Sequence, residues 1–293
     1  PPSYLTMDQA IAAGSDANYR HRLYRGWVEA ARGDVHLRFG RQRIAWGTGK
    51  LWNPTDVLNP FVPTTVERDE RAGVDALYAR TGLGELGQAE SAWTLARDWA
   101  GSDLLGRLRG NRAGTDFSAM GGKVAGSTGS WMAGGDFASD LAGGSLHGEA
   151  AYVDPRTAPP YWRALAGYET TLSAAAPEPF KDLWALAEVY RNGQGSVHPA
   201  RYDFSALLTG RTISLGKDYA GAGLRKDLHP LVQLEIYQLV NLDDGSAFFA
   251  PALDWNALAN LHLSGGWQRF SGGRGTEYGR LANLAFLQAQ YFF

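Results

Sequence analysis

Apolar and polar residues alternate along many short stretches of this chain, and this pattern constrains the fold more than any other feature. Between residues 160 and 172, Trp162, Ala164, Ala166 and Tyr168 alternate with polar residues such as Arg163. A period of two is typical of a strand with one apolar and one polar face, because successive side chains point to opposite sides. Turn-forming residues separate these stretches, and no segment keeps helical spacing long enough to predict βαβ units. The pattern therefore predicts an all-β fold of antiparallel strands in up-and-down order.

About fourteen strands are predicted, and counts of about twelve or sixteen also fit the even numbers of closed barrels. The predicted strands lie at residues 20–31, 34–46, 72–82, 86–97, 114–124, 128–138, 143–154, 160–172, 179–192, 215–226, 230–242, 247–258, 259–270 and 280–293.

Two kinds of all-β protein carry such alternation, and they differ in which face meets water. A soluble sandwich buries its apolar face, whereas an outer-membrane barrel turns it towards lipid and lines its lumen with the polar face. Here the apolar face is rich in Gly and Ala, too small to fill a sandwich core, and aromatic residues cluster near the ends of the predicted strands. The sequence therefore favours a transmembrane antiparallel up-and-down β-barrel formed as a single domain by residues 1–293.

The last predicted strand supports the same interpretation. Leu287, Ala289 and Tyr291 alternate with glutamines, and the chain ends on Phe293. This ending resembles the signal by which Gram-negative cells recognise barrel proteins for insertion, which assigns an assembly role to Tyr291 and Phe293. The expected partners are outer-membrane lipid and the barrel-assembly machinery.

Composition excludes several other classes of protein. The 293 residues include no Cys, so the chain has no disulfide framework, no thiolate metal site and no CxxCH haem attachment. A formal net charge of −2 argues against nucleic acid as a partner, because that affinity comes from many cations meeting phosphates. No apolar run is long enough for a membrane-spanning helix. The chain begins Pro1-Pro2 with no signal peptide, so we interpret it as a mature chain and leave its completeness open.

The most specific motif runs from residue 40 to residue 75. Residues 40–60 read GRQRIAWGTGKLWNPTDVLNP, and residues 67–75 read ERDERAGVD. This pattern resembles a family of Gram-negative outer-membrane porin-like barrel proteins, some of whose relatives are linked to complexes with multihaem cytochromes. The resemblance implies a barrel in the outer membrane with a pore-like role, but it names no substrate.

The connection at 47–66 within this motif is long and stiff. Its prolines fix backbone angles, and its Asn, Thr and Asp side chains can hydrogen-bond to nearby backbone groups. One interpretation is a loop that folds into the lumen and narrows it, carrying Lys50, Trp52 and Asp56; the other is a packed cap that seals one rim. The residues expected to shape the loop are Trp46, Trp52, Asn53, Pro54, Asn59 and Pro60.

Charged residues define a candidate lumen. Arg25 and Arg38 are expected to project from the first hairpin onto one wall, opposite a wall rich in acids, and opposed charges create a transverse field. The alternative is that these charges pair with one another. The full candidate set for the lumen and its selectivity is Arg25, Arg38, Lys50, Asp56, Asp75, Glu149, Arg163, Glu169, Glu188, Glu235 and Asp254.

No motif in the chain indicates catalysis. Histidines are scattered, no Ser lies in a nucleophile elbow, and no spacing suggests a metal or cofactor site. The residues at 47–50 lack the full spacing of a phosphate loop. We therefore expect no enzyme, no catalytic residue, no metal and no cofactor. The expected function is passive diffusion of small hydrophilic solutes or ions through an outer-membrane channel; the alternative is a structural sheath or scaffold for a partner such as a multihaem cytochrome. A homo-oligomer is also compatible with the sequence.

Overall fold

The computed structural model describes residues 8–13, 18–60, 64, 73–126, 129–208 and 212–292. Phe293 therefore lies outside the described residues, as do parts of the 47–66 connection and of the motif that follows it.

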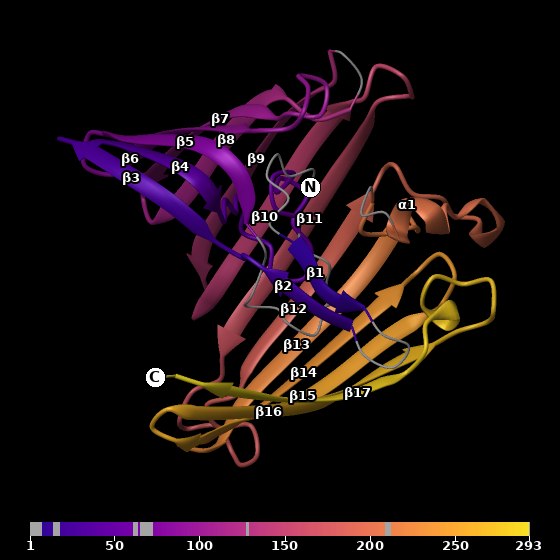
Figure 1. Cartoon of the computed structure of the whole chain (residues 1–293). Helices are drawn as coiled ribbons and strands as arrows, with labels where there is room; N and C mark the ends of the chain where they lie inside the picture. The colour runs from indigo at the N-terminus through magenta and orange to yellow at the C-terminus, as the bar shows by residue number, and fades with distance from the viewer. Residues whose placement is uncertain are drawn as a thin grey trace. The chain divides into compact units, whose positions relative to one another are not determined.

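Fifteen strands form one sheet in which neighbours in the chain are also neighbours in the sheet, and every register resolved between them is antiparallel (Figure 1). The predicted all-β, antiparallel, up-and-down fold class is thus confirmed. The strands are β3(Gly26–Arg32), β4(Val35–Gln42), β5(Val74–Leu83), β6(Gly87–Thr94), β7(Leu104–Arg112), β8(Thr115–Lys123), β9(Trp131–Leu141), β10(Gly144–Asp154), β11(Tyr161–Thr171), β12(Trp184–Asn192), β13(Asp218–His229), β14(Val232–Asn241), β15(Ala247–Leu258), β16(Leu261–Ser271) and β17(Leu284–Tyr291).

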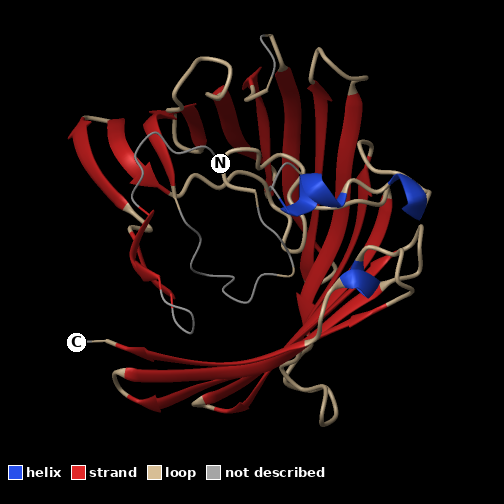
Figure 2. Ribbon diagram, turned by 45° about the vertical axis from the view of Figure 1, so that its right-hand side comes forward, coloured by secondary structure: helices blue, strands red, loops and turns tan. Residues whose placement is uncertain are grey.

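Secondary structure outside this sheet is sparse. Strands β1(Asp8–Ala13) and β2(Asn18–Arg22) pair in a separate two-stranded sheet. Figure 2 shows short helical turns in the connections, namely η1(Pro199–Arg201), α1(Phe204–Leu208) and η2(Tyr278–Arg280). In the part of the chain that the structure describes, no helix is long and apolar enough to cross a membrane.

The structure divides one predicted strand and adds one that was not predicted. The predicted strand at 20–31 is divided, because β2 ends at Arg22 and β3 begins only at Gly26, which leaves Arg25 in the connection. Strand β7 was not predicted at all. Its adjacent Leu104 and Leu105 break the alternation, and the arginines that follow resemble a solvated loop.

The chain divides into two compact units. The first, unit 1, comprises Pro1–Phe137 and Glu149–Trp162; the second, unit 2, comprises Ala138–Gly148 and Arg163–Phe293.

In unit 1, the segment 43–60 covers one face of the strands. Ile44, Trp46 and Leu58 of this segment are at most 4% exposed and share a hydrophobic core with inward residues of the strands. The strand residues of that core are Val74, Ala76, Ala92, Leu105, Met120, Met132, Ala151 and Val153. We call this side the covered face of unit 1. The opposite face exposes large apolar side chains, namely Val28, Phe39, Leu77, Trp93, Leu104, Leu108 and Phe117.

Unit 2 shows the same inversion of polarity between its two faces. In β12, Val189 is 57% exposed while its neighbour Glu188 is 2% exposed. In β17, Leu287 is 94% exposed, whereas Gln288 beside it is half-buried. Apolar side chains therefore point outwards where polar or charged ones are buried or half-buried, and for β17 the alternation in the sequence predicts this arrangement.

The connections differ in length at the two ends of the strands. In unit 1 the turns 33–34, 84–86 and 113–114 are short, whereas the connections 43–73, 95–103 and 124–130 at the other end are longer. In unit 2 the turns 142–143, 230–231 and 259–260 are short, and the connections 193–217 and 272–283 at the opposite end are long. The connection 172–183 is the exception at the short-turn end.

Candidate functional site

Several residues of the 40–60 motif make polar contacts with the covered face of unit 1. Antiparallel pairing places opposed residues on the same face of a sheet. The register aligns His36 with Arg80, Arg80 with Glu90, and Glu90 with Arg107, so that polar and charged side chains from four neighbouring strands form one row.

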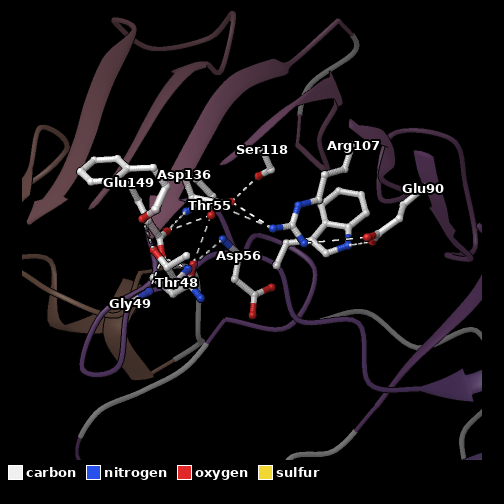
Figure 3. A network of polar contacts seen from close by, with 12 residues as sticks. Thr48, Gly49, Thr55, Asp56, Glu90, Arg107, Ser118, Asp136 and Glu149 are labelled. Carbon is white, nitrogen blue, oxygen red and sulfur yellow. Dashed lines mark hydrogen bonds and ion pairs between the residues drawn. The ribbon is translucent and has the colours of Figure 1, made fainter. Parts of the chain in front are cut away.

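Glu149 of β10 holds the segment 43–60 against this face. Its carboxylate accepts hydrogen bonds from the backbone N–H groups of Thr48 and Gly49, each at 2.5 Å. It also accepts from the N–H of Thr55 at 3.2 Å and from the Thr55 hydroxyl at 2.8 Å (Figure 3). Four donors thus meet one carboxylate that is 4% exposed, and hydrogen bonds to a charged acceptor are the strong ones.

Two glycines make this approach possible. Gly47 has a φ of +99°, and a Cβ there would lie 2.6 Å from a carboxylate oxygen of Glu149. A Cβ at Gly49 would lie 1.9 Å from the carbonyl oxygen of Trp52. The glycines that resemble part of a phosphate loop in the sequence therefore serve to wrap the backbone around a carboxylate.

The rest of the segment is packed and capped by its own side chains. Trp52 is 1% exposed and Leu51 is fully buried. The Asn53 side chain accepts from the Asp56 N–H at 3.2 Å, and the Asp56 carboxylate accepts from the Asn59 N–H at 2.9 Å. The remaining candidates differ: Pro54 is buried, whereas Lys50 and Pro60 are exposed.

A second network joins the segment to the strands. The indole N–H of Trp46 donates to Glu90 at 2.7 Å, and a guanidinium nitrogen of Arg107 lies 4.0 Å from the Glu90 carboxylate. Arg107 also donates to Asp136 at 3.1 Å, and Ser118 donates to the same carboxylate (Figure 3). The network fixes the position of Trp46 and compensates the buried charges.

The first hairpin differs from its prediction. Arg38 donates to Glu29 at 2.6 Å, and His36 contacts the same carboxylate at 3.0 Å. For Arg38 the structure therefore shows the alternative in which the charges pair, because the register places Glu29 opposite Arg38. Arg25 is exposed and precedes β3.

The other predicted charges do not converge on one site; most pair with near neighbours. In unit 1, Asp75 forms a buried ion pair with Arg41 at 2.8 Å. In unit 2, Glu188 contacts His147 at 2.9 Å, Arg163 donates to Gln194 at 3.1 Å, and Glu169 accepts from Trp184 at 3.0 Å. The pairs Glu235–Arg225 at 3.9 Å and Asp254–His262 at 3.6 Å complete this set.

A cation-lined cavity on the covered face of unit 1 was missed by the sequence reasoning. Its volume is about 240 Å³. It is lined by Arg38, Gln42, Arg43, Ile44, Ala45, Trp46, Tyr78, Arg80, Gln88, Glu90, Arg107 and Arg109. One feature of the sequence could have revealed it: in the run Gly106-Arg107-Leu108-Arg109-Gly110 the arginines alternate with apolar residues with a period of two, as in a strand.

Unit 2 has a polar cluster where its long connections meet. Glu277 precedes η2 and accepts hydrogen bonds from the Leu215 N–H at 3.1 Å, the Tyr219 hydroxyl at 2.6 Å and the Asn241 side chain at 2.7 Å. Burial raises the pKa of the Glu277 carboxyl above its usual range, because the charged form loses its hydration. We call Glu277 and these three donors the end cluster of unit 2.

Within the described ranges, no group of three or more His, Asp or Glu side chains is placed to hold a metal ion. The polar groups described above bind one another and position the segment 43–60.

In comparisons with known proteins, no family model matches the chain and no curated protein matches it.

Proposed function

We propose that this chain is a β-barrel of the Gram-negative outer membrane and that it acts as a passive channel for small hydrophilic solutes or ions. The observation that carries the proposal is the inverted polarity of the sheet. Val28 is 70% and Leu287 94% exposed, whereas Glu149 and Glu188 are at most 4% exposed. In a soluble protein this apolar surface would face water. Soluble monomers rarely expose contiguous apolar patches larger than a few hundred Å², so a soluble protein fits this surface poorly.

A lipid environment accounts for both faces at once. The outward apolar side chains meet hydrocarbon, and the inward polar side chains meet water or one another. In lipid, an unpaired strand edge costs several kcal/mol for each unsatisfied group, so the edges of the sheet at β3 and β17 need to be covered. Closure into a barrel meets this requirement.

The lengths of the connections favour an orientation. Outer-membrane barrels have short turns on the periplasmic side and longer loops outside the cell. We therefore assign the turns 33–34 and 259–260 to the periplasm and the connections 193–217 and 272–283 to the outside. This orientation leaves the end of β17 at the periplasmic side, where barrel-assembly machinery would meet Tyr291.

In this proposal the segment 43–60 narrows the channel. It packs on the covered face through Trp46 and is held there by Glu149. Solutes would diffuse past it without any chemical step, so the proposal includes no catalytic residue and no cofactor.

One observation favours a second function, in which the barrel is a sheath or scaffold for a partner. The same segment fills part of the covered face, and filling reduces the room for free passage. A multihaem cytochrome is the partner that the 40–75 motif implies through its family resemblance.

Reconstitution separates these two functions. The protein is solubilised gently, its absorbance near the haem Soret band and its subunit composition are recorded, and the purified chain is placed in a planar lipid bilayer. A channel gives stepwise ion conductance from the chain alone, with no haem absorbance. Copurified haem together with negligible conductance would reject the channel in favour of the scaffold.

A further inference from the structure

Unit 1 concentrates guanidinium groups in one small space. Five arginines line the cavity of about 240 Å³, against a single acid, Glu90. They come from three strands of the sheet and from the segment 43–60: Arg38 from β4, Arg80 from β5, Arg107 and Arg109 from β7, and Arg43 from the segment. The sheet register brings these arginines together. It places Arg80 and Arg107 on either side of Glu90, and it sets Arg109 opposite Gln88, on the same strand as Glu90.

The acids near the cavity already have partners. Glu29 holds Arg38 at 2.6 Å, and Asp136 holds Arg107 at 3.1 Å. Glu90 accepts the indole N–H of Trp46 at 2.7 Å. Hence the nearby carboxylates balance two of the five arginines.

Three arginines remain. Across the residues that the structure describes, no hydrogen bond or ion pair engages Arg43, Arg80 or Arg109. Arg80 is half-buried, whereas Arg43 and Arg109 are exposed to solvent. A concave surface lined by one sign of charge raises the local concentration of counter-ions.

We propose that this cavity is a binding site for a small oxyanion that carries two or more negative charges. The planar fork of a guanidinium group pairs two N–H donors with two oxygens of a phosphate or carboxylate. The volume is below the range of about 300–1,000 Å³ that suits drug-sized ligands, so the ligand is a compact anion. The inference refines the proposed function by naming its solute class, and it rests on that function only for the idea that the anion passes through the barrel.

Calorimetry with the whole purified chain in detergent micelles tests the site. The probes are inorganic phosphate and then pyrophosphate, titrated in dilute buffer and again at higher salt. We expect one saturable site per chain, with tighter binding of the more highly charged pyrophosphate, and an affinity that falls as salt screens the charges.

Variants identify the residues responsible. Arg109→Gln is expected to weaken binding by about tenfold or more, because it removes a charge-assisted pair. Arg80→Lys keeps the charge but loses the fork, so a smaller loss is expected. Arg112→Gln is the matched control: Arg112 lies at the end of the same strand as Arg109, is exposed and does not line the cavity. The affinity of the Arg112→Gln variant for the anion is expected to remain within about twofold of the wild-type affinity.

The outcomes separate the site from the channel. The proposed site is overturned if no saturable binding is seen in dilute buffer. It is also overturned if Arg112→Gln and Arg109→Gln lose affinity for the anion equally. Because the measurement needs no membrane and no conductance, specific binding by a chain that fails to conduct rejects only the channel. Conductance without saturable binding rejects only the site.

Discussion

Glu277 carries a buried carboxyl group whose pKa is raised by the loss of hydration, and this makes the stability of unit 2 depend on pH. An unfolded glutamate ionises near pH ~4.3. Because the folded chain holds the proton more tightly, the contribution of Glu277 to the free energy of unfolding is greatest below that pH. It falls as pH rises through the raised pKa of the folded state. We therefore expect the end cluster of unit 2 to weaken as pH rises from acidic to neutral values.

Hydrogen exchange of the Leu215 amide, corrected for its intrinsic rate at each pH, measures this effect directly, since that N–H donates to Glu277. Glu277→Gln should flatten the dependence, because an amide does not titrate. Glu178→Gln is the control: its side chain is 73% exposed, and its variant should keep the wild-type slope. An unchanged slope in Glu277→Gln would show that another group is responsible.

At the scale of the elements, the segment 43–60 depends on a carboxylate that is distant in sequence. Glu149 accepts from Thr48, Gly49 and Thr55. A hydrogen bond to a charged group contributes about 1.5–3 kcal/mol, and an amide at this position presents an N–H₂ group towards donors. Glu149→Gln should therefore raise the population in which the segment is open.

Trypsin reports that opening, because Lys50 lies in the segment and is exposed. When reclosing is fast, cleavage follows the population of the open form, so we expect the rate after Lys50 to rise by about tenfold or more. Glu178→Gln again serves as the control and should cleave at the wild-type rate. Equal rates in all three proteins would mean that Glu149 does not hold the segment.

The same elements show what the sequence predicts and what it does not. Alternation is local, so it located β10, β11 and β17 and the face of each that carries the apolar side chains. Pairing is not local. The contact between Glu149 and Thr55 spans 94 positions in the chain, and no pattern around either residue indicates it.

A strand boundary explains why Arg25 differs from its predicted place in the lumen set. The strand predicted at 20–31 is interrupted before Gly26, which leaves Arg25 in the connection, and the boundaries of elements are the least certain part of a sequence-based prediction. The cavity was missed for another reason: no strand was predicted at β7, which left Arg107 and Arg109 out of the candidate lumen residues.

At the scale of the whole molecule, the proposal requires the apolar faces of both units to lie in lipid. The chain has no Cys, so a single introduced cysteine carries a fluorescent label at one known position. Phe117→Cys in unit 1 and Leu287→Cys in unit 2 place the label on the apolar face, at residues that are 48% and 94% exposed. Gln88→Cys and Gln288→Cys place it on the polar side of the same units.

In vesicles, brominated lipid should quench the labels at 117 and 287, because bromine on the acyl chains acts only within hydrocarbon. A water-soluble quencher should instead reach the labels at 88 and 288. Because each unit has its own pair, a result in which only one unit responds to lipid means that only this unit spans the bilayer. If the aqueous quencher reaches all four positions equally, the sheet lies in water. The exposed apolar face then needs a protein partner to cover it, and the channel proposal fails.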